Sequence, residues 1–73
     1  MTLRQFMNEL KHSSIQISLI VDNYQQEPVY NNTLGSLNHW EHLPKYIDYV
    51  IIDIRPMMML KGFHVLIRGD ENE

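Results

Sequence analysis

Residues 49–68, YVIIDIRPMMMLKGFHVLIR, contain two apolar runs on either side of a segment that begins at Pro56 and ends at Gly62. Both runs are rich in β-branched and aromatic residues, and proline or glycine bounds each of them, which is typical of strands. The separation of about half a dozen residues suits an antiparallel hairpin. We therefore expect the rest of the chain to cover one face of this hairpin.

Side chains alternate between the two faces of a strand, so each run divides into two sets. The set expected to face a covering helix is Val50, Ile52, Ile54, Phe63, Val65 and Ile67. The opposite, outer set contains the apolar residues Ile51 and Leu66.

The N-terminal residues predict a helix over 2–11. Thr2 and Gln5 have the spacing of a capping box, in which each side chain bonds a free backbone amide. One apolar stripe follows at helical spacing, formed by Leu3, Phe6, Met7 and Leu10. After Ser14 the apolar period changes to two, which predicts a strand over 15–21 with one face towards the core.

The middle of the chain predicts a turn, a short strand and a short helix. Asp22 and Asn23 favour a turn, and residues 27–30 can return as a strand. Pro28 has no amide hydrogen, so that strand belongs at a sheet edge. A helix is expected to start in the segment 31–33 and to end before Pro44, because proline disfavours helical geometry in the residue before it.

Together these elements predict a small two-layer α+β domain with the order α-β-β-α-β-β. The sheet is expected to be mainly antiparallel, with the first helix packed on one face. We expect one domain over residues 1–69 and a disordered acidic tail over 70–73.

Composition narrows the classes of function. The 73 residues include no cysteine and carry a net charge of −3, and the six bases include no adjacent pair. That distribution argues against nucleic-acid binding. The sequence has no apolar stretch of membrane-spanning length and no signal peptide at its start, so we expect a cytoplasmic protein.

Two groups of polar residues are candidates for a chemical site. His39, Glu41 and His42 could contribute to a metal or small-ligand site, but zinc needs three or four ligands, and the simpler interpretation is a polar helix end. Asp48 and Asp53 point to opposite faces of an extended strand, so they do not form a catalytic pair. We expect no enzymatic activity and no cofactor.

Apolar residues on the outer face suggest an interaction surface instead. Ile20, Ile51 and Leu66, joined by Tyr49, could form an apolar centre with a polar rim. The alternative is that they are ordinary scattered surface residues.

The segment Met57-Met58-Met59 is also unusual for a hairpin connection, which is normally polar. Flexible thioethers suit an adaptable binding surface. Alternatively, the strands run further and alternate methionines extend the core.

The opening Thr2-Leu3-Arg4-Gln5-Phe6, the apolar strand after Ser14, and Leu43-Pro44 before a valine–isoleucine strand carry a resemblance. The chain resembles small uncharacterised proteins of phages and mobile elements of Gram-positive bacteria. This resemblance implies a small α+β accessory protein and transfers no catalytic residue.

The sequence therefore predicts a non-enzymatic interaction or accessory protein. We expect it to self-associate as a homodimer, through the outer sheet face or the hairpin edge, or to bind another protein. The alternative hypothesis is metal or small-ligand binding by His39, Glu41 and His42.

Overall fold

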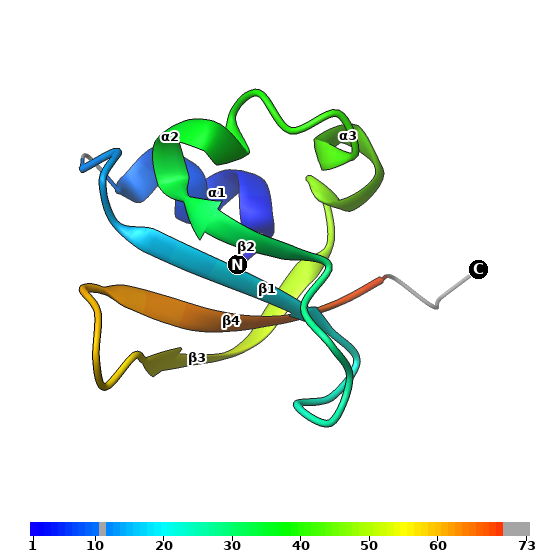
Figure 1. Cartoon of the computed structure of the whole chain (residues 1–73). Coiled ribbons are helices and arrows are strands. Elements are labelled where there is room, and N and C mark those ends of the chain that lie inside the picture. The colour runs from blue at the N-terminus through cyan, green and yellow to red at the C-terminus, as the bar shows by residue number, and fades with distance from the viewer. Residues whose placement is uncertain (11, 70–73) are drawn as a thin grey trace.

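The structure, a computed structural model, describes residues 1–10 and 12–69 and contains four strands and three short helices (Figure 1). In chain order the elements are α1 (Leu3–Glu9), β1 (Gln16–Val21), β2 (Tyr30–Thr33), α2 (Leu34–Leu37), α3 (Leu43–Tyr46), β3 (Val50–Pro56) and β4 (Gly62–Arg68). The prediction of a small α+β domain is confirmed. The acidic tail predicted for residues 70–73 lies outside the described residues.

The strands form one mixed sheet in the order β2-β1-β4-β3. The pairs β1–β2 and β3–β4 are antiparallel, as expected for two hairpins. β1 and β4 join the hairpins in the middle of the sheet and run parallel to each other, with Leu19 opposite Val65. Gly62 permits this close approach, because a Cβ atom there would overlap the backbone carbonyl of Gln16. The sheet is thus antiparallel at its two outer pairs and parallel at its centre.

Helix α1 begins with the predicted capping box. The Gln5 amide donates to the Thr2 hydroxyl over 3.2 Å, and the Thr2 amide donates to the Gln5 side-chain oxygen over 2.8 Å. The helix ends at Glu9 rather than at residue 11, because Leu10 already has extended backbone geometry. Leu3 and Phe6 are buried in the core, and the Phe6 ring meets Phe63 edge-on at 6.4 Å. Helix α1 therefore packs on the face of the sheet that carries Phe63.

The segment between β1 and β3 differs from the prediction in two ways. The second strand starts at Tyr30, three residues later than expected, although it does form a sheet edge. The single predicted helix is two helical turns, α2 and α3. Pro44 lies within the first turn of α3, where its missing amide hydrogen costs nothing. Proline thus starts a helix here instead of ending one.

The core lies between the sheet and the helices, which gather on one side of it in Figure 1. It is formed by Leu3, Phe6, Ile17, Leu19, Tyr30, Leu34, Leu37, Val65 and Ile67. Both α2 leucines are in this set, so a helix of four residues still anchors the chain.

A β-bulge in β3 overturns part of the predicted division into faces. Ile51 pairs with Ile67 and Asp53 pairs with Leu66, which leaves Ile52 as the extra residue. Because an extra residue reverses the alternation, Ile51 packs against the core and Val50 lies on the outer face opposite Arg68. The predictions that Ile51 faces outward and that Val50 faces the helix are therefore wrong, and Ile52 is exposed instead of packing against the core. Ile54 keeps its predicted face, opposite Val65, but its edge position leaves it exposed.

Candidate interaction surface

The predicted outer-face patch does not form an exposed apolar centre. Ile20 and Leu66 are neighbours on β1 and β4 and only 6% and 8% exposed. Neither belongs to the core on the helix side. Tyr24 follows β1, and its hydroxyl donates to Asp53 on β3 over 2.9 Å, so its side chain crosses the intervening strand β4. The chain thus covers the middle of its own outer face.

Tyr49 and Ile51, the other members of that patch, pack against the helix-side core. Tyr49 contacts the Tyr46 ring edge-on at 5.0 Å, and the bulge turns Ile51 inward. The prediction that Tyr49 and Ile51 belong to an outer patch is therefore wrong. The four predicted residues are therefore distributed over two faces of the sheet.

The methionine segment lies at the surface. Met58 and Met59 are 99% and 92% exposed, and the adjacent Leu60 is also exposed, whereas Met57 is half-buried. Strand β3 ends at Pro56, so the strands do not continue through the methionines. The alternative in which the strands run further and alternate methionines extend the core therefore does not hold for Met58 and Met59. We call residues 57–60 the methionine loop.

The edge of β3 is the second exposed apolar feature. This strand is an outer strand of the sheet, and its aliphatic residues Val50, Ile52 and Ile54 are all exposed. An isolated bridge between Thr2 and Val50 occupies the start of the edge, where the Ile51 amide donates to the Met1 carbonyl over 2.7 Å. Within residues 1–10 and 12–69, no strand is paired with the remainder of this edge.

A charged cluster lies on the outer face beside this edge. The Arg55 Nε and the Tyr24 hydroxyl both donate to Oδ2 of Asp53, over 3.0 and 2.9 Å. The Arg55 guanidinium also lies 4.3 Å from the centre of the Tyr24 ring, a cation–π distance. The hydrogen bond from Tyr24, followed by Arg55, lowers the pKa of the Asp53 carboxyl, while burial and the same bond raise the pKa of Tyr24. Asp53 is therefore held as a carboxylate.

The other predicted polar groups lie apart from this cluster. His39, Glu41 and His42 lie in the exposed connection between α2 and α3, where His42 Nε2 is 3.1 Å from a Glu41 oxygen. Across the described part of the chain, no three His, Cys, Asp or Glu side chains are arranged to hold a metal ion. Asp48 pairs with Arg4 at 3.2 Å and does not meet Asp53.

Sequence reasoning missed Tyr24 as a partner of Asp53 and missed the exposure of Val50 and Ile52.

No helix within residues 1–10 and 12–69 is long and apolar enough to cross a membrane. No family model matches the sequence, and no curated protein or solved structure matches it either.

Proposed function

We propose that this chain is a non-enzymatic interaction domain that self-associates through the edge of β3. The observation that carries this proposal is a seven-residue edge strand with three exposed aliphatic side chains next to an exposed methionine loop. Exposed apolar strand edges are templates for pairing with another chain. The partner is a second copy of the same chain.

A comparison of the two sheet edges supports β3 as the pairing edge. The opposite edge strand, β2, has only four residues, and the sequence before it includes Pro28. Its Asn31 and Asn32 are polar and exposed. These features are the usual means by which proteins prevent edge pairing. Strand β3 is longer and more apolar, although its bulge and Pro56 restrict the segment that can pair.

The backbone pattern indicates where a second copy would pair. The Met57 amide donates to the Gly62 carbonyl over 3.0 Å, so residue 57 faces β4. Backbone groups alternate along an antiparallel strand, which places the N–H and C=O of Ile54 on the side away from β4. Two copies related by a two-fold axis at Ile54 would exchange two backbone hydrogen bonds there.

Charge complementarity favours the same register. Antiparallel pairing of Ile54 with its copy places Asp53 of each chain opposite Arg55 of the other, on the same face. Both side-chain hydrogen bonds to Asp53 use Oδ2, and the bond from Arg55 uses Nε. Among the described residues, the terminal nitrogens of Arg55 form no hydrogen bond or ion pair, because the contact with Asp53 uses only Nε. These atoms are available for the second copy.

The apolar groups at the ends of the paired segment extend the proposed contact. In this register the methionine loop of each copy approaches Val50 and Met1 of the other, and all these groups include exposed side chains. Unbranched thioethers adapt readily to an irregular partner surface. A chain of this length has little stability in reserve, and association is one way to add to it.

The proposal that the domain is not an enzyme is supported by the side-chain partners of the carboxylates Asp48 and Asp53. Asp48 is paired with Arg4, and Asp53 is paired with Tyr24 and Arg55. Each carboxylate therefore has a structural role.

Sedimentation velocity over a range of micromolar concentrations tests the proposal. We expect the wild type to sediment as a dimer and Ile54→Lys as a monomer, because a lysine at a strand edge opposes pairing. Val29→Lys is the matched control, since Val29 and Ile54 are both 38% exposed and Val29 lies outside the proposed interface. It should remain dimeric.

Two results would overturn the proposal. One is a wild type that stays monomeric throughout the concentration series. The other is a dimer that Ile54→Lys leaves intact while circular dichroism shows that the variant is folded.

A further inference from the structure

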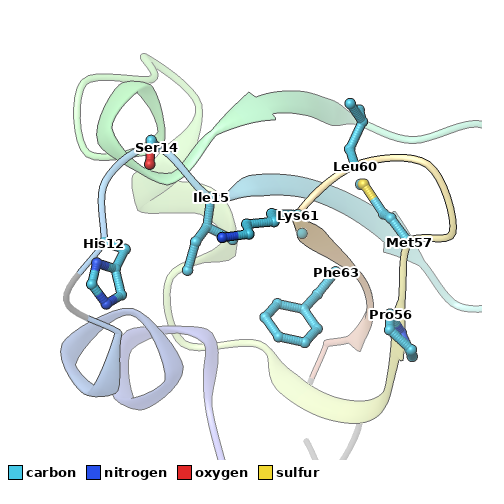
Figure 2. Close-up of a pocket in the computed structure, with 9 residues that line it drawn as sticks. His12, Ser14, Ile15, Pro56, Met57, Leu60, Lys61 and Phe63 are labelled. Atoms are coloured by element: carbon cyan, nitrogen blue, oxygen red, sulfur yellow. The ribbon is translucent and has the colours of Figure 1, made fainter.

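A hollow of about 480 Å³ lies at one end of the sheet, on the side of the core. Its walls come from the segment between α1 and β1, from the end of β3, and from the start of β4 (Figure 2). This volume is within the range of sites that bind small molecules. Ile54, Asp53 and Arg55 do not line the hollow, although Met57 and Leu60 of the methionine loop do.

The inner surface of the hollow is apolar. Ile15, Pro56, Met57 and Phe63 contribute to it, and the Phe63 ring lies across its floor in Figure 2. The edge-on contact with Phe6 holds that ring in place. A fixed aromatic floor with a flexible methionine beside it can accept an aliphatic chain or a ring.

The polar side chains around the hollow are predominantly basic. Lys61 extends from the hairpin towards Ile15, and His12 stands on the opposite wall (Figure 2). Ser14 adds a hydroxyl, and no acidic residue is among the lining residues. Among the described residues, neither Lys61 nor His12 takes part in an ion pair. The ammonium group of Lys61 therefore lies beside an apolar hollow with no carboxylate of its own chain to neutralise it.

We propose that this hollow binds a small amphipathic monocarboxylate, that is, a free aliphatic or aromatic acid. The apolar part lies against Phe63, Ile15 and Met57, and the carboxylate accepts a charge-assisted hydrogen bond from Lys61. His12 supplies a second donor at the mouth. The hollow shares Met57 and Leu60 with the methionine loop, but Lys61 and Phe63 lie outside the proposed dimer contact, and the site goes beyond the interaction function proposed above.

The test is an NMR titration of the ¹⁵N-labelled full chain with octanoate, using octan-1-ol and octylamine as probes of matched length. We expect octanoate to give saturable shifts of the Ile15, Lys61, Gly62 and Phe63 amides. Octan-1-ol should bind more weakly and octylamine should not bind, because Lys61 repels a cation. Lys61→Gln should weaken octanoate binding about tenfold, the cost of losing one hydrogen bond to a charged group.

Lys45→Gln is the matched control, because Lys45 is an exposed lysine that lies over Tyr46 and not in the hollow. It should bind octanoate like the wild type. Repeating the titration with Ile54→Lys keeps the two proposals apart, since Ile54 does not line the hollow and octanoate should still give saturable shifts when self-association is lost.

Three outcomes would overturn the carboxylate site. The first is no saturable shift with octanoate. The second is equal affinity for octanoate and octan-1-ol with no effect of Lys61→Gln. The third is a set of shifts confined to residues outside the hollow.

Discussion

Asp53 follows the bulge in the edge strand β3 and binds the loop after β1 through Tyr24. The bulge places it opposite Leu66 on the outer face, where Tyr24 can reach it from the loop after β1. Arg55 reaches the same oxygen from two residues further along β3. Asp53 thus binds Tyr24, which covers the outer face, and Arg55, which lies beside the open edge of β3.

The pKa of Asp53 should depend on Tyr24. The hydrogen bond from Tyr24 is the main cause of its lowered pKa, so Tyr24→Phe should raise that pKa towards its ordinary value. A ¹³C NMR titration of the Asp53 carboxyl carbon measures this change. Tyr46→Phe is the control, because Tyr46 packs against Trp40 and does not contact Asp53. An Asp53 pKa that is the same in Tyr24→Phe and the wild type would contradict the assignment.

The sign of the accompanying pH effect on stability follows from linkage. A carboxyl whose pKa is lower in the folded state stabilises the fold above its unfolded pKa, and this contribution is lost as the pH falls through the folded value. Tyr24→Phe should therefore reduce the part of the acid sensitivity below about pH 4 that belongs to Asp53.

The C-terminal hairpin and the start of α1 could be predicted from the sequence, but the bulge in β3 could not. The hairpin has strong strand residues and clear boundaries, and the Thr2–Gln5 capping box marks the start of α1. The bulge was not predictable, because Val50, Ile51 and Ile52 are three consecutive β-branched residues with no alternation to reveal a change of face. That one extra residue decides which aliphatic side chains are exposed at the edge.

The methionine loop and α2 show why apolar sequence alone does not locate the core. Leu37 belongs to a single helical turn yet is fully buried, whereas Met58 is almost fully exposed. Leu37→Ala should lower the free energy of unfolding by about 2–5 kcal/mol through lost burial and the cavity left behind. Urea denaturation at a fixed protein concentration measures this loss.

Met58→Ala is the comparison for that experiment. It should change the free energy of unfolding by no more than about 0.5 kcal/mol, as expected for a surface position. A cost for Met58→Ala similar to that of Leu37→Ala would show that the loop is packed in the folded protein.

At the scale of the whole molecule, the strand order could not be derived from the sequence. Local patterns identify each hairpin, but the parallel contact between β1 and β4 joins residues far apart in the chain. The same contact places β3 at the edge of the sheet. The proposed interaction surface on β3 therefore depends on the parallel pairing of β1 with β4, which local sequence patterns do not predict.

The proposed dimer requires opposite charges to meet across its two-fold axis. Asp53→Arg places two arginines of one copy opposite two of the other, and Arg55→Asp does the same with aspartates. Either variant alone should fail to dimerise, because like charges directly opposite on paired strands are destabilising. In a mixture of the two variants, every cross-strand pair is again of opposite charge.

Sedimentation velocity of Asp53→Arg, of Arg55→Asp and of their equimolar mixture tests whether two copies pair through β3 in this register. We expect each variant alone to sediment as an 8.7 kDa monomer and the mixture to sediment at twice that mass. Folded variants that each dimerise like the wild type, or that remain monomeric when mixed, would contradict it.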